Sequence, residues 1–220
     1  MFGTGSIHRI PAQTDTMTDI SLTKTVVVLA ASPADHSTTT HELTQRLRAH
    51  GRNPVRVGRA GPAEPELDRL RRADWSTAVD SVLDACTKER DARRTAAAGD
   101  VLVVGGSPIG ALAWYQAGLS LRGERCDPRI RGWLEGPTVG AAAHYGAVLH
   151  VRPASGAGRA VTLVDEALLA VLERLGIPTF AIFASPSDCE LGHTLDGLFA
   201  SPGHPAVPTS SAARCLTGWP

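Results

Sequence analysis

The sequence predicts an α/β domain in which a five-stranded parallel sheet is covered by helices on both faces, a three-layer sandwich. Short apolar runs alternate with segments of helical periodicity five times along the chain, which is typical of parallel sheets with helical connections. The run at 100–105 is apolar almost throughout, as expected of a strand buried on both faces. The chain has 220 residues, 43% of them hydrophobic, enough for one such core with some excess.

Apolar runs and helix signals place the individual elements. We expect strands at 25–31, 54–58, 100–105, within 137–152 and at 179–184. We expect helices at 37–50, 74–97, 111–121 and 162–175, with Asp74 and Thr162 as N-caps and Gly51 and Gly176 at C-termini. The polar stretches 59–73 and 122–136 are expected to be irregular.

Composition suggests the organisation of the chain and excludes some function classes. Residues 1–23 are expected to form a flexible leader, 24–187 the domain and 188–220 an irregular tail. The net charge of zero argues against nucleic-acid binding, and no apolar run has membrane-spanning length; we therefore expect a cytoplasmic protein. No metal site is predicted, because C-x-x-C spacing is absent among the cysteines, Cys86, Cys126, Cys189 and Cys215.

The turn after the first strand is a candidate anion site. It carries hydroxyls at Ser32 and at 37–40, next to the expected start of a helix. Unpaired N–H groups and the positive end of the helix dipole favour a phosphate there. Neither Gly-Lys-Ser/Thr of a Walker motif nor a Gly-x-Gly-x-x-Gly fingerprint is present. Plain helix capping by the same hydroxyls is the alternative explanation.

Three small polar loops, 31–40, 105–112 and 152–161, follow expected strands. Ligands of open parallel sheets bind beyond the carboxyl ends of the strands, where the strand order reverses. We therefore expect these three loops to converge on one crevice.

These loops resemble those of the NADPH-dependent FMN reductase family, a branch of the flavodoxin-like fold, over about residues 24–186. In the first loop Ser32, Ser37 and Thr39 match the family pattern, and Ala34 stands where the family has Arg. In the second loop Ser107-Pro108 match. Gly110 replaces an aromatic residue there, for which Trp114 or Tyr115 is a candidate substitute. The stretch 152–159 is similar to the family's third loop.

The resemblance implies a flavodoxin-like fold and an oxidoreductase that transfers hydride from NAD(P)H through bound FMN. The cofactor supplies this chemistry, so no catalytic side chain is predicted. The resemblance further implies a homodimer, a small-molecule substrate and transfer of reduced flavin to a partner monooxygenase. The FMN-binding residues that it implies are Ser32, Ser37, Thr38, Thr39, Ser107, Pro108, Ile109, Gly110, Ser155, Gly156 and Arg159.

A second interpretation is a flavodoxin-like domain that has lost flavin, and acts as a partner-binding scaffold or on another small substrate. Ala34 and Gly110 favour it, because each departs from the flavin-binding pattern. The arginines at 122–131 permit three interpretations: they bind the NADPH phosphate, they form a solvent-exposed face, or they lie at the rim of a dimer interface.

Overall fold

The computed structural model describes residues 24–58 and 65–183. The expected leader 1–23, the expected tail 188–220 and the last positions of the expected domain, 184–187, lie outside the described residues. The strands are β1 (Lys24–Ala30), β2 (Asn53–Val57), β3 (Asp100–Val104), β4 (Ala147–Arg152) and β5 (Phe180–Phe183). The helices are α1 (Pro33–Ala49), α2 (Leu67–Arg71), α3 (Trp75–Thr95), α4 (Pro108–Arg122), α5 (Pro128–Ala142) and α6 (Arg159–Leu175).

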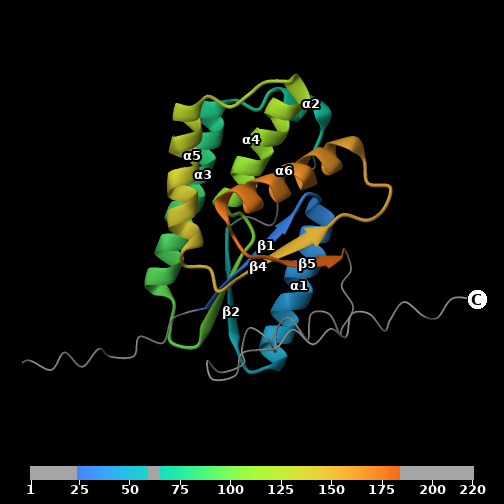
Figure 1. Cartoon of the computed structure of the whole chain (residues 1–220). Coiled ribbons are helices and arrows are strands. Elements are labelled where there is room, and N and C mark those ends of the chain that lie inside the picture. Colours follow the sequence, from blue (N-terminus) through green and yellow to red (C-terminus); the bar gives the residue numbers. More distant parts are fainter. Residues whose placement is uncertain (1–23, 59–64, 184–220) are drawn as a thin grey trace, which may run out of the picture.

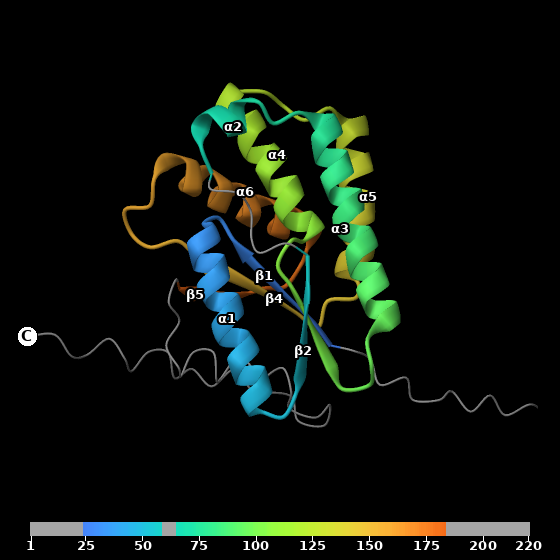
Figure 2. The same ribbon diagram turned by 180° about the vertical axis from the view of Figure 1, so that it is seen from behind.

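The strands form one parallel sheet in the order β2-β3-β1-β4-β5. Helix α1 lies on one face, and α3, α4 and α6 lie over the other (Figures 1 and 2). The predicted five-stranded parallel sheet with helices on both faces is therefore confirmed. The flavodoxin-like refinement is not supported, because that fold has the order 2-1-3-4-5, whereas here β3 lies between β2 and β1.

Side chains of alternating strand residues fill two cores, one on each face. Val27 and Leu29 of β1 pack toward α3, α4 and α6, while Val26 and Val28 pack toward Leu43 and Leu47 of α1. This alternation is the period-2 geometry of a strand. It leaves β1 buried from its second residue onward, so the turn that follows β1 begins in the middle of the molecule.

Three helices begin earlier than the sequence pattern indicated. Helix α1 begins at Pro33, and Ser32 is its N-cap, accepting a hydrogen bond from the Asp35 N–H at 3.5 Å. Helix α4 begins in the same way, at Pro108 after the N-cap Ser107. Proline suits the first helical position because its missing N–H needs no partner there. Helix α6 begins at Arg159, so Thr162 lies inside it.

The stretch 122–136 is not irregular as expected: most of it belongs to α5, which continues to Ala142 and confines β4 to 147–152. Asp127 caps this helix, its Oδ1 accepting a bond from the Arg129 N–H at 2.7 Å. Leu134, Thr138 and Ala141 form its buried face. The short helix α2 likewise lies within the stretch 59–73 that was expected to be irregular. In the part of the chain that the structure describes, no helix is long and apolar enough to span a bilayer.

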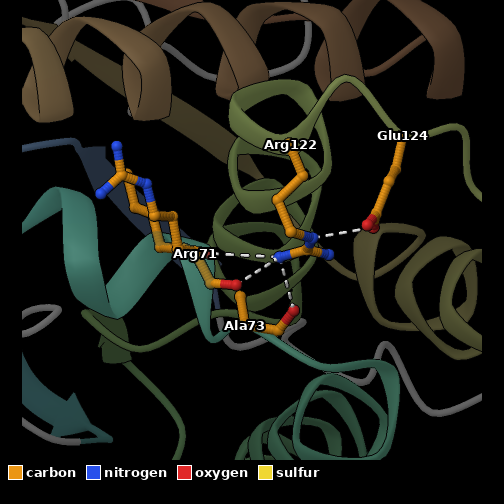
Figure 3. Close-up of polar contacts among 5 residues, drawn as sticks. Arg71, Ala73, Arg122 and Glu124 are labelled. Carbon is orange, nitrogen blue, oxygen red and sulfur yellow. Dashed lines mark hydrogen bonds and ion pairs between the residues drawn. The ribbon is translucent and has the colours of Figure 1, made fainter.

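Arg122 ties α2 to the end of α4 (Figure 3). Its Nη1 donates to the carbonyl oxygens of Arg71 at 2.9 Å and Ala73 at 3.1 Å, and its Nε donates to Glu124 at 2.8 Å. These contacts place the guanidinium at the C-terminal end of α2, where orphan carbonyls need donors. Arg122 therefore stabilises the fold. The sequence had left open that the arginines at 122–131 bind the NADPH phosphate.

Replacing Arg122 with methionine is expected to lower the free energy of unfolding by about 1–2 kcal/mol, because charge-assisted bonds to backbone carbonyls are lost while the aliphatic packing stays. Urea denaturation measures the change. Arg125→Met, at an exposed position nearby, is the control and should change stability by less than about 0.5 kcal/mol. Equal effects of the two variants would contradict the assigned role.

Candidate functional site

A cavity of about 320 Å³ lies at the carboxyl edge of the sheet. Its floor comes from the ends of β1 and the Gly105-Gly106 turn after β3, and its walls come from α3, α4 and α6. The lining is mainly apolar, with Leu29, Ala85, Val164 and Leu168 contributing. A cavity of this size and character at a sheet's carboxyl edge is a typical small-molecule site.

Polar and aromatic groups occupy distinct parts of this cavity. The half-buried Trp114 of α4 lines it together with Ser81, Asp84 and Lys88 of α3. Lys88 Nζ donates to Asp84 Oδ2 at 2.5 Å, and both side chains are more than half exposed. The cavity is thus lined by one tryptophan and one solvated ion pair.

Two glycine turns approach each other closely at the cavity wall. Gly58 follows β2 with φ +85°, and a Cβ there would lie 3.2 Å from the Gly106 nitrogen. The Gly105 N–H donates to the Val57 carbonyl at 3.1 Å, which holds the two turns together. A side chain at position 58 is therefore disfavoured by both conformation and contact, and glycines of both turns line the cavity.

His36 lies in the first turns of α1 and lines the cavity. The side chain is buried, with the residue only 2% exposed. Burial, and next the nearby Arg56 guanidinium, lower the pKa of His36, while hydrogen bonds with the Gly105 and Val28 backbones oppose part of that shift. The cavity therefore has a buried histidine in its lining.

A smaller cavity of about 80 Å³ lies between α1 and the ends of β2 and β3. Ser37, Thr40 and Arg56 line it with His36. The Thr40 hydroxyl is buried without a partner. His36 thus contributes to the lining of both cavities.

The residues that the FMN interpretation singled out do not form one cluster. Ser107 and Gly110 line the larger cavity and Ser37 the smaller one. Ser32 and Ser107 serve as N-caps, while Thr39, Pro108 and Ile109 are buried. Thr38, Ser155, Gly156 and Arg159 are exposed. Of the three loops expected to converge, 152–161 contributes no residue to either cavity.

Sequence reasoning missed the polar residues of α3 and the burial of His36. Trp114 had been named as a substitute aromatic, and it does line the cavity, whereas Tyr115 is buried in the core. Lys88 and Asp84 had no distinguishing signal, because a charged pair four residues apart is common on any exposed helix. The burial of His36 was not predicted, because the helix was expected to begin at residue 37, after His36.

No protein-family model and no curated protein sequence matches this chain. Among solved structures, the chain is similar to the NadR protein in complex with NAD and AMP-PNP, with a TM-score of 0.53, 13% identity and 84% of this chain covered. It is also similar to NadR in complex with NR, with a TM-score of 0.52, 12% identity and 84% coverage. Deoxyadenosine kinase from M. mycoides with bound dATP follows, with a TM-score of 0.47, 12% identity, and 79% of this chain and 98% of that chain covered.

The chain spans about half the length of the NadR structures, 51% and 52%. At this identity the likeness concerns the fold alone. Together with the strand order β2-β3-β1-β4-β5, it corrects the FMN reductase interpretation: the order is not flavodoxin-like, and the solved structures described above are of NadR and deoxyadenosine kinase. The assignments of FMN and NAD(P)H and of an oxidoreductase are therefore wrong, and what the comparisons support for this chain is the α/β fold alone.

Proposed function

We propose that this chain binds a nucleoside or nucleotide in the cavity at the carboxyl edge of the sheet. The observation that carries the proposal is the cavity itself. At about 320 Å³ it reaches the lower end of the size range of sites that bury small organic ligands. Its lining is apolar at Leu29, Val164 and Leu168 and polar at Ser81, Asp84 and Lys88 of α3.

The solved structures support the ligand class. The NadR complexes hold NAD, AMP-PNP or NR according to their descriptions, and all of these are nucleosides or nucleotides. Trp114 of this chain lines the cavity, and aromatic side chains stack on bases of every kind. Stacking on Trp114 is therefore the contact that we assign to the base.

Binding is tested by isothermal titration calorimetry with adenosine, cytidine, AMP and NAD, and by the fluorescence of Trp114. We expect at least one of these ligands to bind in the micromolar to millimolar range. Trp114→Leu should weaken that binding about tenfold, since stacking of one base is worth about 1–3 kcal/mol.

The matched control is Trp133→Leu, at a tryptophan on α5 that is 59% exposed and does not line the cavity. It should leave the affinity unchanged. Absence of binding by all four ligands at millimolar concentration would refute the proposal, and so would equal affinity in native protein and Trp114→Leu.

Phosphoryl transfer is the second candidate activity, favoured by the cation Lys88 and the carboxylate Asp84 in the cavity. Transfer requires cations and metal ligands around the moving phosphate, and these two side chains are at present bonded to each other. Mass spectrometry of nucleosides incubated with the protein and Mg·ATP distinguishes a kinase from a binding protein. A product heavier by one phosphate, lost in Lys88→Met, would establish the kinase.

A further inference from the structure

Helix α5 lacks the polar outer side that is typical of a surface helix. Leu134, Thr138 and Ala141 form the side that packs into the protein. The opposite side, which we call the outer face of α5, consists of the exposed residues between 132 and 143: Gly132, Trp133, Gly136, Val139, Gly140 and Ala143. None of these side chains carries a charge. A helix that is apolar all round is normally buried, so the outer face of α5 indicates a missing partner.

The outer face is uncovered in the described part of the molecule. Helix α5 packs against α3 and α4 and lies on the outside of the helical layer (Figures 1 and 2). Trp133 is 59% exposed and Val139 is 48% exposed. A Cβ at Gly132, Gly136 or Gly140 would meet no atom within 4 Å apart from the helix's own backbone. Contiguous exposed apolar surface of this kind marks an interaction site.

The three glycines leave a shallow groove along the outer face. Their spacing of four residues aligns them in one row on the helix. None of them has a positive φ, and none contacts another described part of the chain through the position of its missing Cβ. Neither conformation nor packing within one copy therefore requires glycine, which is one of the poorest helix formers. Close approach of a partner would require it.

Trp133 and the groove are two complementary parts of one surface. The Trp133 ring is 6.2 Å from that of Trp75 on α3, which is itself 45% exposed. The outer face thus has a large exposed side chain directly beside a row without side chains. A two-fold interface brings the same surface of both copies together, so this surface has to contain both complementary parts. The absence of charge on it also removes like-charge repulsion between identical copies.

The charge at the start of α5 favours an antiparallel pair of helices. Arg129 precedes Gly132 and Trp133 by one turn, in the first turn of α5, and the last turn has no basic residue. A cation is favourable at the C-terminal end of a helix dipole and unfavourable at the N-terminal end. In an antiparallel pair, Arg129 of each copy lies near the C-terminal end of the other α5, whereas a parallel pair would bring two Arg129 side chains together.

We propose that the protein forms a homodimer through the outer face of α5, with the two helices antiparallel and Trp133 of each copy on the glycine groove of the other. No α5 residue lines either cavity at the sheet, so this pairing is separate from the proposed ligand site. With one helix of 15 residues per copy at its centre, the interface is smaller than the roughly 1,200 Å² of stable pairs. We therefore expect a dissociation constant in the micromolar range.

Sedimentation equilibrium of the native chain at about 1 to 300 μM measures the association. We expect the mass to rise from that of one 23.1 kDa chain toward twice that value. A protein that stays monomeric over this range overturns the proposal, whether hydrogen exchange then finds the outer face of α5 covered by another segment of the same chain or open to a different protein.

Filling the groove tests the packing. Gly136→Leu should raise the dissociation constant at least tenfold. The variant should fold as well as the native protein, because the new side chain enters open space and leucine forms helices better than glycine. Gln45→Leu adds the same side chain at an exposed position of α1, on the other face of the sheet, and should dimerise like the native protein. An unchanged or lower dissociation constant in Gly136→Leu overturns the proposed packing.

Disulfide cross-linking tests the orientation. Positions 129 and 143 lie equally far from Gly136 along the chain, so an antiparallel crossing at Gly136 brings position 129 of one copy near position 143 of the other. A mixture of Arg129→Cys and Ala143→Cys should therefore form the mixed disulfide under mild oxidation, and peptide mapping distinguishes it from links through the native cysteines. A predominance of links between two positions 129 overturns the antiparallel arrangement.

Discussion

Replacing Glu89 with glutamine is expected to stabilise the protein at pH 8 by about 3 kcal/mol, with little effect at pH 4.5. Glu89 of α3 is completely buried. Its Oε1 accepts a hydrogen bond from the Tyr145 hydroxyl at 3.1 Å, and its Oε2 lies 3.5 Å from Arg93 Nη1. The carboxyl therefore joins α3 to the segment between α5 and β4.

Burial raises the pKa of Glu89 to about 7, although the Tyr145 hydrogen bond and the Arg93 charge oppose the shift. The fold favours the protonated carboxyl, so its stabilising contribution is complete below the unfolded pKa of about 4.5 and is lost as pH rises through the folded value of about 7. A difference of this size corresponds to about 3 kcal/mol. Glutamine keeps the shape and the neutral polarity at every pH.

Urea denaturation between pH 4.5 and pH 8 measures the effect. The native protein should lose stability across this range more than Glu89→Gln does. Glu173→Gln, at an exposed position on α6, should follow the native profile. Tyr145→Phe removes a hydrogen bond to the ionised carboxyl and should deepen the alkaline loss. Parallel profiles for the native protein and Glu89→Gln would contradict the assigned pKa.

The strands were predictable from the sequence because burial on both faces leaves little but apolar residues. β1 and β3 are buried from their second residue onward, and both appear as plain apolar runs. For the same reason their order in the sheet was not predictable. A uniformly apolar strand is compatible with either interior position, so the pattern did not distinguish β2-β3-β1 from the flavodoxin-like order.

Helix α5 was missed because its stability comes from tertiary packing. Gly132, Gly136, Gly140 and Pro137 give it poor intrinsic propensity. The helix is held instead by its buried face against α3 and by the Asp127 cap. The start of α1 carried a readable signal, since Ser32-Pro33 is a typical N-cap followed by proline at the first helical position.

The location of the candidate site was more predictable than its chemistry. The carboxyl edge of the sheet follows from topology alone, and the Ser107 turn was named and does line the cavity. The four hydroxyls at 37–40 suggested a phosphate site only under the expectation that α1 begins beside them. Once α1 begins at Pro33, Thr39 is buried and Ser37 and Thr38 are exposed, and His36 is the residue of this turn that lines the larger cavity.

The second large effect is expected at Asp165, where alanine should lower the free energy of unfolding by about 3 kcal/mol. His150 of β4 and Asp165 of α6 are joined by a 2.7 Å contact between Nε2 and Oδ1, with side chains only 1% and 7% exposed. Arg152 Nε lies 3.6 Å from the other carboxylate oxygen. The pair holds α6 to the sheet on the face that carries the larger cavity.

Alanine at 165 would leave His150 buried with no partner at either nitrogen, because Nδ1 already has none, and an unsatisfied buried polar group costs about 1–3 kcal/mol on top of the lost bond. Asp165→Asn keeps an oxygen for His150 but loses the charge opposite Arg152, so about 1 kcal/mol is expected. Glu166→Gln, on the exposed side of the same turn, is the control and should change little. Chemical denaturation that ranks Asp165→Asn below Asp165→Ala in stability would contradict the hydrogen bond as the source of the effect, since the asparagine alone can still accept from His150.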